Sequence, residues 1–268
     1  MERRLAVMAG AGVLPGRAAA EAARQGWRVV AFAFDEAAGL SPHAERVVPS
    51  SITDIQGVLR ELGQSRVSAA VFVGKLWKRD VFSGADAADD AGRELARAGL
   101  SDEALAGMIL ATLEGIGIEV LDQRAFLHPW MVGAGTITTR APSPAEWSEI
   151  RAGFALARHL ASHGIGQTVV RSRGVTLAVE AAEGTDETIR RGTSLGGPGA
   201  VVVKAVAAGH DFRFDIPTIG AATLEAMAAG GATALAVEQG KVLIVDREAT
   251  VHIAARAGIT IVSADGDG

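Results

Sequence analysis

Carboxylates and arginines gather in a stretch of the second half of the chain that directly follows a predicted strand. The tetrapeptide Glu183-Gly184-Thr185-Asp186 reads as the start of a helix whose first amides are available to a ligand. Arg190 falls four residues after Asp186, so an ion pair on the helix surface is one interpretation. The alternative interpretation is that these acids and Arg190 hold a metal-bound phosphate.

A second charged stretch follows Lys204 and reads as a strand over residues 211–215. Strand periodicity places Asp211, Arg213 and Asp215 on one face and the two intervening phenylalanines on the other. Carboxylate oxygens at this density suit Mg²⁺ or Mn²⁺. A charged outer face of an edge strand is the alternative.

Glycines follow the first predicted strand. Gly10, Gly12 and Leu14 lie in a loop that opens a helix, and Asp35 ends the next strand. This arrangement resembles the glycine loop and ribose-binding acid of dinucleotide-binding folds, although the glycine spacing differs by one residue. It predicts a nucleotide or phosphate site, with a tight turn that binds nothing as the alternative.

Lys75 follows the third predicted strand. In a parallel sheet the loop after this strand lies at the same edge as the first glycine loop, where ligands of such sheets bind. Lys75 is therefore expected to bind a phosphate. The alternative is a solvated surface lysine.

Strands and helices alternate in the first half of the chain, which predicts an α/β fold with a mostly parallel, Rossmann-like sheet. Strands are expected at residues 4–9, 27–34, 67–73 and 118–121, and helices at 17–25, 53–62, 85–97 and 101–113.

The second half mixes antiparallel and parallel signals and predicts a second, mixed α/β domain. Ser143, Pro144 and Glu146 form a capping-box pattern that starts a helix ending near His163. The expected division is an N-terminal Rossmann-like nucleotide-binding domain at 1–130, a linker at 131–142 and a C-terminal catalytic domain at 143–268.

Composition narrows the function classes. The 268 residues carry a net charge of −5, no cysteine and no tyrosine, which argues against thiolate chemistry and nucleic-acid binding. Glycines and a proline interrupt the apolar N-terminal stretch that begins at Leu5, which argues against a signal peptide. The sequence contains no run of about 18 apolar residues, so no membrane-spanning helix is expected. His159 and His163 have the spacing of a zinc pair but lack the glutamate of the metalloprotease pattern.

Taken together, these motifs resemble the UDP-2,3-diacylglucosamine pyrophosphatases of the non-calcineurin type, which belong to the lipid A pathway. The resemblance covers nearly the whole chain, and its specific elements are Glu183-Gly184-Thr185-Asp186 and the segment from Asp211 to Pro217. Ala11 departs from the pattern, where a third glycine is expected.

The resemblance implies hydrolysis, dependent on Mg²⁺ or Mn²⁺, of UDP-2,3-diacylglucosamine to UMP and 2,3-diacylglucosamine 1-phosphate. It also implies a cytoplasmic location, with transient contact at the inner membrane, and it is compatible with a homodimer.

Residue roles follow as hypotheses. Asp215 is expected to bind the metal or activate water, with Asp186 and Glu183 as supporting ligands. Lys204, Arg190 and Arg213 are expected to neutralise phosphate charge. The remaining substrate-binding candidates are Gly10, Gly12, Leu14, Lys75 and Thr185.

Two rival functions remain at this stage. A nicotinamide-dependent oxidoreductase would use the glycine loop and Asp35, but it leaves the acid clusters of the second half without a role. A non-catalytic sensor of a nucleotide-sugar would bind its ligand without releasing UMP.

Overall fold

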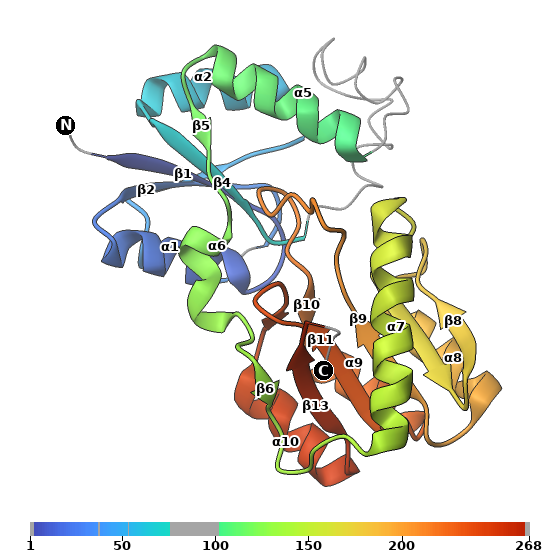
Figure 1. The fold of residues 1–268 in the computed structure, drawn as a ribbon. Helices are drawn as coiled ribbons and strands as arrows, with labels where there is room; N and C mark the ends of the chain where they lie inside the picture. Colours follow the sequence, from blue (N-terminus) through green and yellow to red (C-terminus); the bar gives the residue numbers. More distant parts are fainter. Residues whose placement is uncertain (1–2, 37, 53, 76–101, 266–268) are drawn as a thin grey trace. The chain divides into compact units, whose positions relative to one another are not determined.

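The computed structural model describes residues 3–36, 38–52, 54–75 and 102–265, so the helix expected at 85–97 lies outside the described residues. The chain forms two compact units (Figure 1). Unit 1 comprises Met1–Pro129 and Asp211–Asp215, and unit 2 comprises Trp130–His210 and Ile216–Gly268.

Unit 1 is built on a parallel sheet whose five strands lie in the order β3-β2-β1-β4-β5. The strands are β1 (Arg4–Ala9), β2 (Arg28–Ala33), β3 (Arg46–Pro49), β4 (Ala69–Val73) and β5 (Glu119–Val120). The central strand β1 and its neighbour β4 are almost fully buried apolar runs, as expected for a sheet that is covered on both faces. The predicted Rossmann-like parallel sheet is confirmed.

Helices cover both faces of this sheet, with α2 and α5 on one face and α1 and α6 on the other (Figure 1). Their bounds are α1 (Leu14–Arg24), α2 (Ile55–Ser65), α5 (Asp102–Gly115) and α6 (Arg124–Leu127), followed by the 3₁₀ turn η2 (His128–Trp130). Leu62 of α2 and Leu113 of α5 pack with Phe32 of β2 in one buried cluster.

Unit 2 contains a mixed sheet of six strands in the order β6-β13-β11-β9-β7-β8. Its strands are β6 (Gly135–Thr136), β7 (Thr168–Ser172), β8 (Val175–Val179), β9 (Val201–Lys204), β11 (Ala234–Glu238) and β13 (Thr260–Ala264). Strands β9, β11 and β13 are parallel, whereas β6, β7 and β8 pair antiparallel to their neighbours. A separate parallel pair joins β10 (Thr218–Ile219) to β12 (Leu243–Ile244). The predicted mixed second domain is confirmed.

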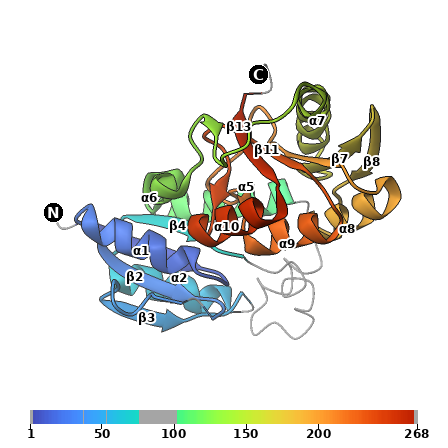
Figure 2. The same ribbon diagram turned by 90° about the horizontal axis from the view of Figure 1, so that it is seen from below.

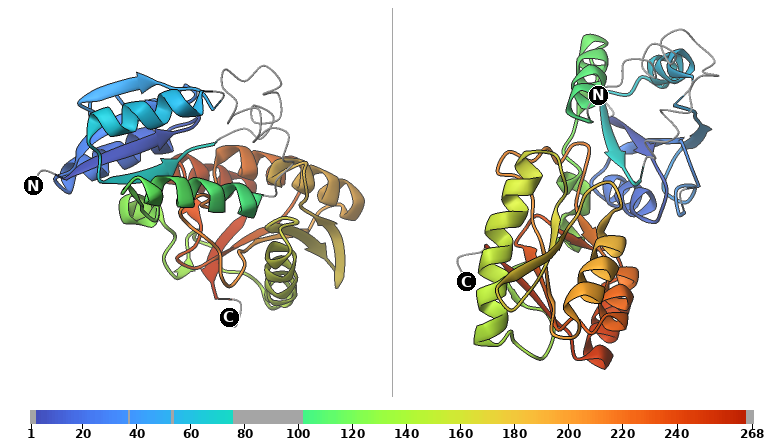
Figure 3. Two further views of the ribbon diagram at one scale, coloured as in Figure 1. Left: turned by 90° about the horizontal axis from the view of Figure 1, so that it is seen from above. Right: turned by 90° about the vertical axis from the view of Figure 1, so that its right-hand side faces the viewer.

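The two faces of the unit 2 sheet carry different helices. These are α7 (Pro144–Ser162), α8 (Thr185–Gly196), α9 (Ala221–Ala229) and α10 (Arg247–Ala257). Helix α7 lies on one face, and α8, α9 and α10 lie side by side on the other (Figures 2 and 3). Along β9, Val202 packs with Ile189 of α8, whereas Val201 packs with Phe154 of α7. This alternation is the period-two pattern of a strand that is buried on both faces.

Local sequence signals decide where several of these elements begin and end. At the start of α7, the Ser143 hydroxyl accepts from the Glu146 amide at 3.3 Å, and the Glu146 carboxylate accepts from the Ser143 amide at 2.7 Å. The predicted capping box is therefore present. The hairpin β7–β8 turns at Arg173 and Gly174, which both have positive φ, as a type I′ hairpin turn requires.

Two segments differ from the expectations. Residues 131–142, expected to be a linker, lie in unit 2, where β6 pairs with β13 and Val132 is buried in the core. The segment Asp211–Asp215, expected to be a strand, is a turn that belongs to unit 1. Its phenylalanines are nevertheless directed inward, since Phe212 is buried and the Phe214 ring lies 5.2 Å from that of Phe72.

Candidate active site

Lys204 lies at the end of β9 with only 5% of its surface exposed, and polar side chains from β7, from α8 and from the residue after β8 surround it. Its ammonium donates to the Thr185 hydroxyl at 2.7 Å and to the Thr168 hydroxyl at 3.4 Å. Glu180 Oε2 lies 3.9 Å from Lys204 Nζ, and Glu180 Oε1 accepts from Thr185 at 2.9 Å. A buried ammonium in such a network is a fixed positive charge.

The amino end of α8 belongs to this network, because Thr185 is the first residue of the helix. Gly184 is the N-cap with φ +85°, and no side chain caps the helix there. The amides of the first turn, which begins at Thr185, have no helical carbonyl partner, and the helix dipole makes this end positive. Lys204 and the start of α8 thus place two sources of positive potential at one point.

Asp186 and Arg190 do not form the surface ion pair that their spacing suggests, because each has another partner. The Asp186 carboxylate accepts from the Thr223 hydroxyl at 3.2 Å, and Arg190 pairs with Glu187 at 2.5 Å. The interpretation of Arg190 and Asp186 as an ion pair is therefore wrong, because Glu187, three residues before Arg190, takes the guanidinium.

The Glu183 side chain is engaged by neighbouring side chains of the protein. Its carboxylate accepts from the Arg191 guanidinium and from the Thr188 hydroxyl. Its own backbone amide and Arg191 lower the pKa of the Glu183 carboxyl. A metal ion at Glu183 would have to compete with Arg191.

The turn that contains Asp215 is fixed by its first residue. The Asp211 carboxylate accepts from the Arg213 amide at 3.0 Å and pairs with the Arg213 guanidinium at 2.8 Å. The hydrogen bonds from the Arg213 guanidinium to the Asp211 carboxylate raise the pKa of Arg213. Arg124 stacks over the Phe212 ring at 3.9 Å. Asp215 is exposed at the end of this anchored turn.

The glycine loop of unit 1 is joined to the loop that contains Lys75. The Gly10 amide donates to the Val73 carbonyl at 2.9 Å, and Ala11 and Lys75 exchange backbone hydrogen bonds at 2.9 and 3.1 Å. A Cβ atom on Gly10 would lie 2.7 Å from the Lys75 carbonyl oxygen, so Gly10 is needed for this close approach. Its amide is consequently engaged with the protein.

Gly12 and Leu14 lie beyond this bridge. Gly12 has φ +101°, which favours glycine, and Leu14 is the first residue of α1. No side chain caps α1, and Pro15 contributes no amide proton. The amides of residues 12–14 are therefore the part of the loop suited to an anion, since those of Gly10 and Ala11 bond to the protein.

The candidate residues fall into two groups. Unit 1 contains Gly10, Gly12, Leu14, Lys75, Arg213 and Asp215, and unit 2 contains Glu183, Thr185, Asp186, Arg190 and Lys204. Within unit 2 the structure brings Lys204 and Thr185 into contact. Among the described residues, no three histidine, aspartate or glutamate side chains form a group able to hold a metal ion.

Sequence reasoning missed two polar partners of the site, Thr168 and Thr223. Thr168 pairs directly with Lys204 in the β7–β9 register, and its hydroxyl contacts the ammonium. A threonine at the start of an apolar strand was the available signal, but identifying its partner required the strand pairing.

A buried acid at the end of the neighbouring strand β11 fixes the segment after β9. Glu238 accepts from the Val206 amide at 2.9 Å and pairs with Arg158 and Lys241 at 2.9 and 2.8 Å. Burial raises the pKa of Glu238, but its bonds to Lys241, Val206 and Arg158 lower it by more. Glu238 therefore remains a carboxylate that ties β11 to the chain beyond Lys204.

The comparison with protein families decides where this chain belongs. A model described as the LpxI N-terminal domain matches residues 4–130, and one described as the LpxI C-terminal domain matches residues 133–262. The chain belongs to the LpxI family. The resemblance drawn from the motifs is thereby confirmed, and the two LpxI domains meet close to the boundary between units 1 and 2.

One LpxI relative has a stated activity. It is the UDP-2,3-diacylglucosamine pyrophosphatase LpxI of Caulobacter vibrioides (strain ATCC 19089 / CIP 103742 / CB 15), which is 32% identical over 174 residues. The match covers 61% of this chain and 61% of the relative, which is less than two thirds of the relative's length.

Two solved structures have a distant likeness to this chain. A UDP-glucose-4-epimerase from Stenotrophomonas maltophila is 17% identical, with 37% of this chain and 33% of the epimerase covered and a TM-score of 0.26. An N5-carboxyaminoimidazole ribonucleotide synthetase from Thermotoga maritima is 12% identical, with coverages of 68% and 42% and a TM-score of 0.28. At these TM-scores the likenesses support no statement about function.

Across the described residues, none of the helices has the length and apolar character needed to span a membrane.

Proposed function

We propose that this chain hydrolyses the diphosphate bond of UDP-2,3-diacylglucosamine, releasing UMP and 2,3-diacylglucosamine 1-phosphate for lipid A synthesis. The LpxI models support this over residues 4–130 and 133–262, and the Caulobacter vibrioides relative is named for this activity. The observation that carries the proposal is the buried Lys204 ammonium at the uncapped start of α8. This is a preformed positive site for a group that gains negative charge during reaction.

The proposed reaction is attack of water on a phosphorus atom, with cleavage of the bond to the bridging oxygen. Negative charge develops on the phosphoryl oxygens and on the leaving phosphate. Lys204 and the amides of Thr185 and the next residue would stabilise this charge. Because Thr185 and Glu180 already fix the ammonium, little reorganisation is needed when the charge develops.

Asp215 is the candidate to accept the proton of the attacking water. Its turn is anchored by the buried Phe212 and by the bond from the Arg213 amide to Asp211. An exposed carboxylate on an anchored turn keeps its position while remaining accessible to water and substrate. Arg213, oriented by Asp211, would bind a phosphate oxygen in the substrate.

A divalent ion remains part of the proposal, and among the acids named from the sequence Asp215 and Asp186 are each kept as a candidate ligand. Asp186 uses only one oxygen for Thr223, whereas Glu183 is engaged by Arg191. Mg²⁺ or Mn²⁺ bound by carboxylates would supply additional positive charge for the diphosphate oxygens.

Removal of divalent ions is expected to abolish UMP release, and Mg²⁺ or Mn²⁺ is expected to restore it. The reason is that the cations of the proposed site already face acids of the protein: Lys204 lies 3.9 Å from Glu180, Arg213 pairs with Asp211 and Arg190 pairs with Glu187. A divalent ion would supply further positive charge for the diphosphate oxygens. The measurement is UMP release after treatment with EDTA and then after addition of each metal. Full activity after exhaustive chelation would remove the metal from the mechanism, and restoration by Zn²⁺ alone would point to His159 and His163.

The proposed substrate also suggests a location and a partner. Two acyl chains hold the substrate in a membrane, since each buried CH₂ contributes about 0.8 kcal/mol. We infer that the chain works in the cytoplasm and contacts the inner membrane transiently while it binds the lipid. Its oligomeric state, for which a homodimer is the working hypothesis, is open to measurement by light scattering.

A further inference from the structure

Two short turns of unit 1 share one sequence pattern. The pattern is an aspartate followed two residues later by an arginine, and the chain contains it only at Asp122–Arg124 and Asp211–Arg213. In each turn the aspartate accepts from the arginine amide, at 2.8 Å in the first and 3.0 Å in the second. It also pairs with the guanidinium, at 2.6 and 2.8 Å. Each turn therefore holds its own arginine side chain in a fixed orientation.

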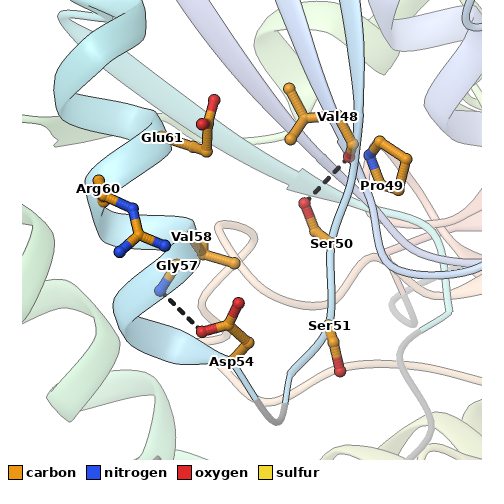
Figure 4. A pocket seen from close by; sticks show the side chains of 9 residues that line it. All are labelled: Val48, Pro49, Ser50, Ser51, Asp54, Gly57, Val58, Arg60 and Glu61. Carbon is orange, nitrogen blue, oxygen red and sulfur yellow. Dashed lines mark hydrogen bonds between the residues drawn. The ribbon is translucent and has the colours of Figure 1, made fainter. Parts of the chain in front are cut away.

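A third aspartate of unit 1 closes a turn without such an arginine. Asp54 accepts from the Gly57 amide at 2.9 Å and caps α2 (Figure 4). Gln56 occupies the position two residues after it. Because an aspartate alone suffices to close a turn or cap a helix, the guanidinium is the part of the shared pattern that needs an explanation.

The two patterned turns contact each other directly. The Gln123 amide donates to the Phe212 carbonyl at 3.2 Å. The central carbon of the Arg124 guanidinium lies 3.9 Å from the centre of the Phe212 ring. The guanidinium of Arg124 thus bonds to Asp122 through its edge and covers Phe212 with its face. A planar guanidinium can make both contacts at once, whereas the ammonium of a lysine cannot.

The first turn is attached to the packed part of unit 1. Helix α6 begins at Arg124, and its Phe126 and Leu127 are buried. The Gln25 side chain, which follows α1, donates to the Ala125 carbonyl at 2.9 Å. The Asp122–Arg124 turn is therefore a firm support for whatever lies against it.

The second turn depends more on side-chain contacts. Residues 211–215 are part of no strand of the unit 1 sheet, so no ladder of backbone hydrogen bonds fixes them. Phe214 packs against Phe72, and Phe212 is buried with Arg124 over its ring. Loss of the Arg124 contact would loosen the turn on the side where Phe212 lies.

We propose that Arg124 is a positioning residue for the reaction. Its guanidinium, held by Asp122, fixes the Phe212 ring and with it the turn that carries Arg213 and Asp215. This inference rests on the proposed function, which gives Arg213 and Asp215 their roles. A displacement of about 1 Å at a reacting group can cost about 10²-fold in rate, so a contact that only holds the turn can affect turnover.

The first test is a double-mutant cycle in the full chain. The Arg124→Met variant keeps an unbranched apolar stem but loses the bonds to Asp122 and the planar cation. Its kcat for UMP release is expected to fall about tenfold, with a smaller change in KM. In the Phe212→Leu background the same substitution is expected to lower kcat by less than about twofold, because the ring through which Arg124 acts is already absent.

The second test does not require activity. Hydrogen exchange measured by NMR reports the Gln123 amide, which joins the two turns. In Arg124→Met this amide is expected to exchange about tenfold faster, while the amides of β1 keep their parental rates. Unchanged exchange in β1 separates local loosening of the turn from a general loss of stability.

Arg24→Met is the matched control. Arg24 is an exposed arginine in the last turn of α1, and it pairs with Glu21 at 2.6 Å, the same distance as Arg124 and Asp122. Glu21 keeps the Gln25 side chain as a partner at 2.9 Å. Parental kcat and parental exchange of the Gln123 amide are expected from this control.

The outcomes separate this proposal from the proposed function. Parental kcat in Arg124→Met, or an equal loss of kcat in the parental and Phe212→Leu backgrounds, would show that Arg124 does not act through Phe212 and would overturn the proposal. If the parent releases no UMP but the Gln123 amide responds as expected, Arg124 does hold the turn and the proposed activity fails.

Discussion

Replacement of Lys204 by methionine is expected to lower kcat for UMP release about 10²–10³-fold, the usual cost of removing one preorganised charge donor. Methionine retains most of the apolar stem but lacks the ammonium that contacts Thr185 at 2.7 Å. Because the start of α8 remains in place, part of the positive potential survives. The residual activity should therefore exceed the uncatalysed rate.

The variant also removes the charge that lies 3.9 Å from Glu180, so a loss of stability must be separated from a loss of catalysis. An uncompensated buried charge costs about 3–5 kcal/mol, and removing both partners avoids most of that cost. The double variant Lys204→Met, Glu180→Gln is accordingly expected to melt near the parental temperature and to remain inactive.

Lys241→Met is the matched control for Lys204. Lys241 also pairs with a buried glutamate of unit 2, at 2.8 Å, but Glu238 keeps Arg158 when this lysine is lost. We expect parental kcat from this control. If the double variant folds and releases UMP at the parental rate, Lys204 is a structural residue and the electrostatic account of the site is wrong.

Replacement of Asp215 by alanine is expected to reduce turnover at least about 10²-fold, as loss of a general base or principal metal ligand does. The fold should survive, because Asp215 is exposed and the buried Phe212 and the packed Phe214 hold the turn. Substrate binding should largely remain, so uncleaved UDP-2,3-diacylglucosamine is expected to copurify with the variant. Mass spectrometry of the purified protein detects it.

Asp265→Ala controls for loss of an exposed carboxylate, since Asp265 is an exposed aspartate near the C-terminus and belongs to none of the charged motifs. It should retain parental activity. Parental turnover by a folded Asp215→Ala variant would mean that Asp215 only shapes the turn.

Elements with strong local signals could be predicted from the sequence. Helix α7 begins at the predicted residue because Ser143 and Glu146 satisfy each other's backbone amides, an interaction within four residues. Strands β1 and β4 could be predicted because continuous apolar runs suit a sheet that is covered on both faces.

The segment Asp211–Asp215 shows where periodicity misleads. Its alternation of charged and aromatic residues matches a strand, but the Asp211 carboxylate bonds to the amide two residues later and closes a turn. Phe214 then packs against Phe72, about 140 residues away in sequence, so the turn joins unit 1 although its neighbours belong to unit 2. Sequence periodicity contains no information about that distant partner.

The sequence predicted which residues belong to the candidate site better than it predicted the contacts that they make. Lys204 was expected near phosphate, but its contacts with Thr168 and Thr185 depend on strand register and on the position of α8. Gly10 was expected to bind the substrate, and the structure shows that its amide bonds to the Val73 carbonyl. Both differences arise from contacts between segments far apart in the chain.

The most direct test of the proposed activity is product analysis after incubation of the purified chain with UDP-2,3-diacylglucosamine and Mg²⁺. We expect equal amounts of UMP and 2,3-diacylglucosamine 1-phosphate, with no change in absorbance when NAD(H) or NADP(H) is added. Tight binding of the substrate without UMP would instead identify a nucleotide-sugar sensor, and nicotinamide turnover would identify an oxidoreductase. Either result would contradict the account.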